Sequence, residues 1–260
     1  MSALLDIADI TVRFGGLTAV DAVSFSVTDG QLLGLIGPNG AGKTTAMRVI
    51  TGIVPPNDGA VRLAGRNLNG LPTQKRARLG LGLSQQLVRP FRDLTIQENV
   101  VLAAGYRKTQ NPLRALSTLD RAPERLRAQE LLRRVGIEDR ANAMPSEAPL
   151  GVLKRLEVAR ALALDPKLIL LDEPLAGLNS AEASRLADTI VDLNSEGLTV
   201  VLIEHNLGEV MRICQHLVVL DNGRKIGDGA PKTVMADPVV RAAYLGVGAA
   251  SEGEAADAAA

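Results

Sequence analysis

Hydrophobic positions near the start of the chain follow the two-residue period of β-strands. Residues 4–14 and 19–28 alternate between apolar and polar types, and Gly15 and Gly16 stand between them. This alternation predicts two antiparallel strands joined by a turn. Residues 32–36 are instead apolar throughout apart from one glycine, which predicts a buried strand.

The middle of the chain has a helical period. Apolar residues recur at helical spacing through residues 96–105, 124–136 and 152–164. We therefore predict an α-helical insertion, rich in Arg and Glu, over about residues 95–164. Charge pairs on the surface of such helices are typical of a solvated face and contribute only a few tenths of a kcal/mol each.

Apolar strands return after this insertion. Residues 168–171 and 199–204 predict buried strands, and residues 181–195 between them predict an amphipathic helix. Residues 217–220 predict a further strand that ends in the hairpin turn Asp221-Asn222-Gly223. Buried strands that alternate with helices predict an α/β fold.

The turn after residues 32–36 carries the first candidate chemistry. Its spacing matches the phosphate-binding pattern G-x-x-x-x-G-K-[S/T], and a helix-forming run starts at Ala46. Glycines let consecutive N–H groups face inward, and with the helix N-terminus they form an anion-binding nest. Lys43 is expected to reach the β- and γ-phosphates of a nucleotide, and Thr44 to bind Mg²⁺. The residues expected to bind the nucleotide are Gly37, Pro38, Asn39, Gly40, Ala41, Gly42, Lys43, Thr44 and Thr45.

Two adjacent acidic residues carry the second candidate chemistry. Asp172 and Glu173 follow the buried strand 168–171, and open α/β sheets bind ligands at the carboxyl ends of their strands. We expect Asp172 to hold Mg²⁺ through water and Glu173 to act as the general base toward the attacking water. The alternative is that the two acids only cap a loop.

Two further residues allow both a structural and a functional interpretation. Phe14 ends the first strand, and its periodicity favours a half-buried strand aromatic over a platform for a nucleotide base. His205 follows the strand 199–204, where most histidines are structural. Its place beside the expected phosphate site makes a γ-phosphate contact plausible.

Composition excludes several classes of protein. The chain has 260 residues, and its 29 Lys and Arg residues balance 29 Asp and Glu residues, so no long-range positive field attracts nucleic acid. Only 2% of the residues are aromatic, which argues against base-stacking surfaces for single-stranded nucleic acid. Its one cysteine, Cys214, has apolar neighbours and is expected to be a buried structural thiol in a reducing compartment. Asp6 and Asp9 interrupt any signal peptide, and no run of about eighteen apolar residues predicts a membrane span. Residues 247–260 are expected to form a disordered tail.

Together these features resemble the ATP-binding subunits of ABC transporters. The resemblance covers residues 4–246 and rests on motifs in the family's order, namely the phosphate loop, Gln86, Asp172-Glu173, Ala176-Gly177-Leu178-Asn179 and His205. It implies a P-loop NTPase domain with an antiparallel β subdomain and an inserted α-helical subdomain. The implied core consists of about residues 4–94 and 165–246.

The resemblance also implies roles for individual residues. The family forms a head-to-tail dimer that holds two ATP molecules between its chains. Phe14 then stacks on the adenine, Gln86 senses Mg²⁺ and couples to the membrane subunit, and His205 is the switch residue on the γ-phosphate. The implied catalytic residues are Glu173, His205 and Gln86, and the implied metal ligands are Thr44, Gln86 and Asp172.

Four segments narrow the resemblance to the ATPase subunits of branched-chain amino-acid importers. These segments are residues 14–20, 156–162, 176–179 and 243–246. The narrower match implies membrane permease subunits as partners, together with a second ATPase subunit or a second copy of the chain. It also implies an indirect link to an extracytoplasmic substrate-binding protein and a place on the cytoplasmic face of the cell membrane. Importers of related small amides, such as urea, carry similar subunits.

The family signature L-S-G-G-Q is degenerate in this chain. Ala148-Pro149-Leu150-Gly151-Val152 occupies its position, and only Gly151 is retained. In the family this segment binds, in trans, the ATP held by the other chain, and Pro149 supplies neither a hydroxyl nor an N–H. We therefore expect an asymmetric heterodimer in which the site built on Lys43 and Glu173 hydrolyses ATP and the site completed by Gly151 turns over poorly.

Two other functions stay open from the sequence. The degenerate signature is compatible with an ATP-gated clamp that hydrolyses little ATP. A soluble ABC ATPase of translation or DNA repair is disfavoured by the single cassette, the short helical insertion and the neutral charge. The transport direction is a property of the permease.

Overall fold

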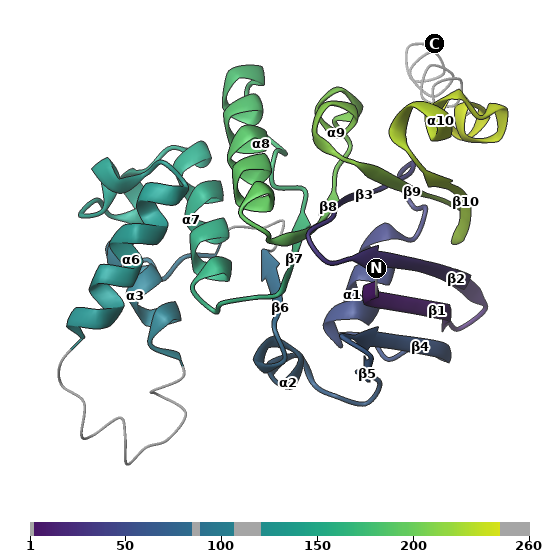
Figure 1. Ribbon diagram of the computed structural model, residues 1–260, viewed down its shortest axis with the longest axis horizontal. Helices are drawn as coiled ribbons and strands as arrows, with labels where there is room; N and C mark the ends of the chain where they lie inside the picture. The colour runs from purple at the N-terminus through teal and green to yellow at the C-terminus, as the bar shows by residue number, and fades with distance from the viewer. Residues whose placement is uncertain (1–2, 85–88, 107–120, 245–260) are drawn as a thin grey trace, which may run out of the picture. The chain divides into compact units, whose positions relative to one another are not determined.

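The computed structural model describes residues 3–84, 89–106 and 121–244 (Figure 1). The chain divides into two compact units. The first contains residues 1–76 and 201–260, and the second contains residues 77–200.

An antiparallel sheet forms the N-terminal part of the first unit. It consists of β1 (Ala3–Phe14), β2 (Leu17–Thr28), β4 (Asp58–Leu63) and β5 (Arg66–Asn67), in the order β2-β1-β4-β5. Phe14 pairs with Leu17 where β1 turns into β2, and Gly15 adopts a positive φ of 56° in that turn. The predicted hairpin is confirmed.

A second sheet in this unit leads to the phosphate loop. Its strands are β3 (Leu32–Ile36), β9 (His216–Asp221), β10 (Arg224–Gly229) and β8 (Thr199–Ile203), which enters the unit at Val201, in the order β10-β9-β3-β8. β3 and β9 are parallel, whereas β9 and β10 form an antiparallel hairpin. Every residue of β3 is buried, as its apolar run predicts.

The helices of the first unit are short. They are α1 (Lys43–Thr51), α9 (Leu207–Ile213) and α10 (Pro231–Ala236), and residues 238–244 are also helical. α2 (Thr73–Arg78) runs across the boundary between the units. Helix α1 begins at Lys43, three residues before the expected start at Ala46, because Gly42 in the left-handed region provides the N-cap.

The second unit combines a parallel strand pair with a group of helices. β6 (Leu81–Ser84) pairs in parallel with β7 (Leu168–Asp172), whose residues are all buried. The helices are α3 (Ile96–Ala104), α6 (Ala122–Arg134), α7 (Leu150–Leu162) and α8 (Ser180–Ser195), with the 3-10 turns η1 (Glu138–Arg140) and η2 (Pro145–Glu147). α3, α6 and α7 contact one another, as the predicted helical insertion requires (Figure 1).

Three sequence predictions concern a subdomain boundary or residues outside the described ranges. The predicted helical subdomain 95–164 lies within the second unit, and its boundaries stay a prediction. Gln86 and the predicted tail 247–260 lie outside the described residues. Across the described part of the chain, no helix has both the length and the apolar character needed to cross a bilayer.

Candidate nucleotide site

Two glycines fix the path of the phosphate loop between β3 and α1. Gly37 has a φ of 149°, and a Cβ built on it would lie 2.0 Å from the carbonyl oxygen of Leu220 on β9. Gly42 has a φ of 97°, and its Cβ would lie 2.6 Å from the carbonyl oxygen of Ala19. Side chains at these two positions would collide with backbone atoms, so only glycine allows this loop.

Lys43 is held across the loop that precedes it. Its Nζ donates hydrogen bonds of 2.8 Å to the carbonyl oxygens of Gly37 and Pro38, and the residue is only 5% exposed. Burial of an ammonium is unfavourable unless it is hydrogen-bonded. The two carbonyls therefore fix a positive charge at the mouth of the loop, where a phosphate chain would be bound.

The N-terminus of α1 adds a second source of positive potential. Gly42 is its N-cap, and neither a side-chain cap nor an acidic residue occurs in its first turn. The first N–H groups of a helix lack intrahelical acceptors and carry the positive end of the helix dipole. Together with exposed Thr44, this helix start suits a polyphosphate anion.

A cavity of about 540 Å³ opens over the loop. It is lined by Phe14, residues 17–19, residues 40–45 and the turn Asn222-Gly223. Phe14 is 51% exposed, and its ring lies on the wall of the same cavity as the phosphate loop. This position favours the base-platform interpretation over that of a half-buried strand aromatic, which the periodicity alone had favoured.

The turn Asn222-Gly223 is a part of the site that sequence reasoning missed. The Gly223 N–H donates to the carbonyl of Ala41 at 3.1 Å, and the Asp21 N–H donates to the carbonyl of Gly223 at 2.8 Å. The turn therefore ties the β9–β10 hairpin to both the loop and β2. Its Asn-Gly sequence predicts a hairpin turn, but no local signal links it to residue 41.

The paired acids belong to the second unit. Asp172 is the buried last residue of β7, and Glu173 follows it with a φ of 48°, an uncommon backbone conformation for a residue with a side chain. Lys154, itself 5% exposed, donates from Nζ to the carbonyl oxygen of Glu173 at 2.9 Å. The helix that carries the signature position thus holds the backbone of the candidate general base.

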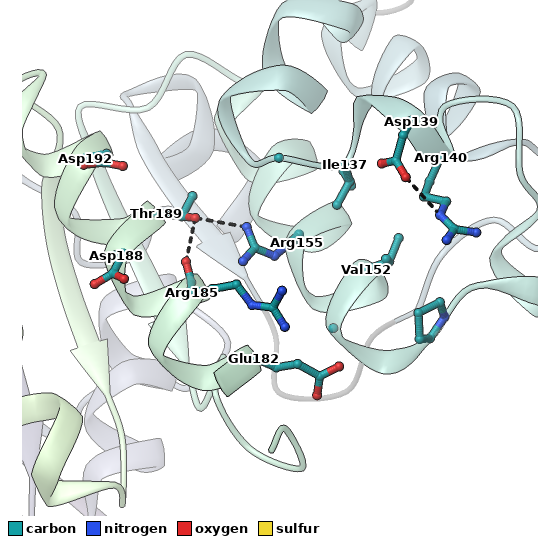
Figure 2. Close-up of a pocket in the computed structure, with 13 residues that line it drawn as sticks. Ile137, Asp139, Arg140, Val152, Arg155, Glu182, Arg185, Asp188, Thr189 and Asp192 are labelled. Carbon is teal, nitrogen blue, oxygen red and sulfur yellow. Dashed lines mark hydrogen bonds and ion pairs between the residues drawn. The ribbon is translucent and has the colours of Figure 1, made fainter. Parts of the chain in front are cut away.

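Pro149 is the N-cap of α7 and provides no side-chain cap to it. Gly151 lies in the first turn of this helix, and a Cβ built on it would lie 3.4 Å from Oε1 of Glu182 on α8. Both residues line a cavity of about 510 Å³. Its other lining residues come from the start of α7, from η1 and from one face of α8 (Figure 2). The signature position is thus an uncapped helix start with a carboxylate beside it.

A basic side chain closes one wall of that cavity. Arg155 donates to the Thr189 hydroxyl at 3.0 Å and to the Val135 carbonyl at 2.7 Å, as Figure 2 shows for the first of these bonds. Burial and the neighbouring Arg185 both lower the pKa of Arg155. These bonds join α7 to α8 and to the end of α6.

Of the two remaining candidate residues, His205 is described by the structure and Gln86 is not. β8 ends at Ile203, one residue before the predicted end at Glu204, and His205 is exposed just beyond it; the backbone N–H of His205 donates to Oε2 of Glu204 at 3.2 Å. The first unit thus contains Phe14, residues 37–45 and His205, whereas Asp172, Glu173 and Gly151 belong to the second. Gln86 lies outside the described residues, so its role stays a prediction.

The residues available for Mg²⁺ are oxygen donors. Thr44 provides a hydroxyl and Asp172 a carboxylate, which are ligand types that Mg²⁺ takes together with substrate phosphates. No cluster of three or more His, Cys, Asp or Glu side chains suited to a metal occurs among the residues that the structure describes. Thr44 belongs to the first unit and Asp172 to the second, and each by itself is an oxygen donor of the type that Mg²⁺ takes.

Cys214 is a structural thiol, as the sequence predicts. It is buried at the end of α9, and burial together with the nearby Glu204 carboxylate raises its pKa to about 12. The thiolate is the nucleophilic form of cysteine, and this pKa keeps it scarce at neutral pH.

Comparisons with known proteins place the chain in one family. The family model described as ABC transporter matches residues 20–176, and the model described as branched-chain amino acid ATP-binding cassette transporter matches residues 224–250. The chain is 39% identical to the high-affinity branched-chain amino acid transport ATP-binding protein BraF of Pseudomonas aeruginosa over 249 residues, which cover 94% of this chain and 98% of that protein. It is 38% identical to LivG of Escherichia coli, named for the same transport, over 255 residues, with the same coverage.

Other relatives extend the comparison to a different cargo and to solved structures. LptB of Acidithiobacillus ferridurans, a lipopolysaccharide export system ATP-binding protein, is 36% identical over 248 residues, which cover 95% of this chain and 98% of that protein. A crystal structure of the ADP conformation of an ATP-binding cassette from an ABC transporter is similar with a TM-score of 0.82 and 29% identity, and the match covers 95% of this chain and 100% of the other. A nucleotide-free cassette gives a TM-score of 0.80 and 29% identity over 94% of this chain and 99% of the other. The predicted fold class is confirmed.

Proposed function

The chain belongs to the ABC transporter ATPase family, and on that premise we propose that it hydrolyses MgATP to drive import of branched-chain amino acids or related small amino acids or amides. The observation that carries the proposal is the buried Lys43 ammonium, held by the carbonyls of Gly37 and Pro38 beside a cavity that also contains Phe14. The side of the cavity at Phe14 suits a nucleotide base, and the side at Lys43 suits a phosphate chain.

In the proposed reaction each residue has a defined task. Phe14 stacks on the adenine, the N–H groups of residues 37–45 bind the phosphates, and Lys43 neutralises charge on the β- and γ-phosphates. Glu173 accepts a proton from the attacking water, and His205 contacts the γ-phosphate. Mg²⁺, bound through Thr44, Asp172 and Gln86, would neutralise phosphate charge.

The proposed assembly contains more than this chain. Two ATPase subunits bind head to tail, and each completes the ATP site of the other through its signature segment. They dock on permease subunits at the cytoplasmic face of the membrane, and an extracytoplasmic substrate-binding protein delivers the cargo. No nucleic acid takes part.

Two findings favour amino-acid cargo over other cargo. The relatives named for branched-chain amino acid transport are 38–39% identical over nearly the whole chain, and a model described by the same transport matches residues 224–250. The LptB relative, at 36% identity, makes lipopolysaccharide export the competing assignment.

The cargo is tested by transport in the source organism. Deletion of the gene should abolish high-affinity uptake of radiolabelled leucine, and wild-type chain should restore it while Lys43→Met should not. Unlabelled valine and isoleucine should compete with leucine, whereas urea should not. Normal leucine uptake together with a defect in lipopolysaccharide export would contradict the proposal and favour the second assignment.

The N-cap position of α7 gives a test of asymmetry. Pro149→Ser restores a hydroxyl at the signature, which in the proposed dimer lies at the partner's ATP site. A charge-assisted hydrogen bond contributes about 1.5–3 kcal/mol, so we expect ATP turnover of the assembled transporter to rise severalfold. The measurement is phosphate release by the complex in lipid.

A second variant separates the two ATP sites in this experiment. The gain from Pro149→Ser should persist when the same chain also carries Glu173→Gln, because that change silences the chain's own site and leaves the partner's site intact. A gain that vanishes in the Glu173→Gln background would argue against the asymmetric assignment. Negligible turnover in both the wild type and Pro149→Ser would favour the ATP-gated clamp.

A further inference from the structure

The buried side chain of Lys154 contacts the backbone of the candidate general base. Lys154 lies early in α7 and is 5% exposed, and its Nζ donates a 2.9 Å hydrogen bond to the carbonyl oxygen of Glu173. Burial of an ammonium group is unfavourable unless hydrogen bonds replace those to water. The bond to residue 173 is one that keeps this ammonium buried, so the lysine and the backbone of residue 173 hold each other in place.

The backbone of Glu173 has a conformation that needs such support. Its φ of 48° lies in the left-handed region, which residues with a Cβ rarely adopt and which persists where surrounding contacts fix it. The carbonyl of Glu173 also accepts a 3.2 Å hydrogen bond from the N–H of Ala176. Two donors, one on α7 and one in the turn that follows, therefore fix the peptide group next to the Glu173 side chain.

A second contact joins the start of α7 to the same turn. Gly177 has a φ of 80°, and a Cβ built on it would lie 3.0 Å from Cδ2 of Leu150. Leu150 occupies the third position of the signature segment, where the family pattern has glycine. The degenerate signature thus adds a side chain that packs on the turn, and the residues after Asp172 are attached to α7 at both Leu150 and Lys154.

We propose that Lys154 is a positioning residue for ATP hydrolysis, whose hydrogen bond holds the backbone of Glu173 so that the Glu173 carboxylate reaches the attacking water. This inference rests on the proposed function, in which Glu173 is the general base. A general base acts only within hydrogen-bond reach of the proton that it accepts, and a misplacement of about 1 Å can slow a reaction by about a hundredfold. In this role Lys154 acts through residue 173.

The test removes the donor and keeps the length of the side chain. Lys154→Met should lower the ATP turnover of the assembled transporter at saturating ATP by about 10- to 100-fold, because a misplaced base accepts the proton slowly. The Kd for ATP should change less than threefold, a split that a general loss of structure would not produce. Phosphate release by the complex in lipid and equilibrium titration with ATP give the two quantities.

Two control variants separate the hydrogen bond from charge and shape. Lys154→Arg keeps a cationic donor at the position and should retain turnover within threefold of wild type. Lys167→Met removes the same charge from an exposed lysine of the same unit and should change turnover less than twofold.

A double-mutant cycle shows whether Lys154 acts through Glu173. In a chain that already carries Glu173→Gln the base is absent, so the position of residue 173 no longer limits the proton transfer. Adding Lys154→Met to that chain should therefore change the remaining turnover less than twofold.

Several results would overturn the inference. They are wild-type turnover in Lys154→Met, a loss of tenfold or more in Lys154→Arg, a fall in ATP affinity that accounts for the lost turnover, and a further tenfold loss in the Glu173→Gln background. Wild-type turnover in Glu173→Gln alone would instead overturn the proposed role of Glu173. The same set of variants thus distinguishes failure of the inference from failure of the proposed function.

Discussion

Lys43→Met is expected to lower the ATP turnover of the assembled transporter at least a hundredfold, which corresponds to about 2.7 kcal/mol of lost transition-state stabilisation. Methionine has about the same length as lysine but no charge, so the carbonyls of Gly37 and Pro38 lose the ammonium that they now bind at 2.8 Å. Charge that develops on the phosphates then lacks its nearest fixed counter-charge. Steady-state phosphate release measures the effect.

The matched control for this change is Lys75→Met. Lys75 is an exposed lysine on α2, and its replacement removes the same charge from the chain's total. Turnover in this variant should stay within twofold of wild type. If both lysine variants lost activity equally, net charge rather than the loop geometry would be responsible.

Glu173→Gln is expected to separate ATP binding from hydrolysis. The amide preserves the size of the side chain but cannot accept a proton, and a general base contributes about 10²- to 10⁴-fold. We therefore expect hydrolysis at this chain's site to fall by that factor while the Kd for ATP changes less than threefold. Single-turnover hydrolysis and equilibrium binding, measured on the same preparation, give the two quantities.

Backbone support at residue 173 should survive this substitution. Lys154 donates to the backbone carbonyl of residue 173, a hydrogen bond that replacement of the side chain leaves in place. Glu138→Gln, at an exposed acid on η1, is the control and should be silent. Wild-type hydrolysis in Glu173→Gln would remove Glu173 from the role of general base.

The parts of the site that the sequence predicts are those encoded over short stretches. The strand, glycine turn and helix around residues 32–51 follow from the apolar run, the glycine spacing and the helix-forming run; the structure confirms these three elements and moves the helix start from Ala46 to Lys43. The same holds for β7, whose four apolar residues precede Asp172. In each case the pattern and the element occupy the same short stretch of the chain.

Contacts between distant parts of the chain could not be predicted in this way. The hydrogen bond from Gly223 to Ala41 joins the β9–β10 turn to the phosphate loop, which lies far away in the sequence. This contact depends on the strand order β10-β9-β3, which hydrophobic period alone does not determine. The exposure of Phe14 is a similar case, since alternation along β1 predicts a face but not the cavity beside it.

The burial of Cys214 has a practical consequence for spectroscopy. It is the chain's single cysteine, and its thiol is both enclosed and protonated at neutral pH. It is the thiolate that attacks maleimide and methanethiosulfonate reagents, so these reagents should leave the native chain unmodified. Cysteines introduced at exposed Ile53 and Leu126, one in each unit, can then carry a pair of spin labels without replacement of Cys214. Pulsed dipolar measurements on such a pair would follow domain motion through the ATP cycle.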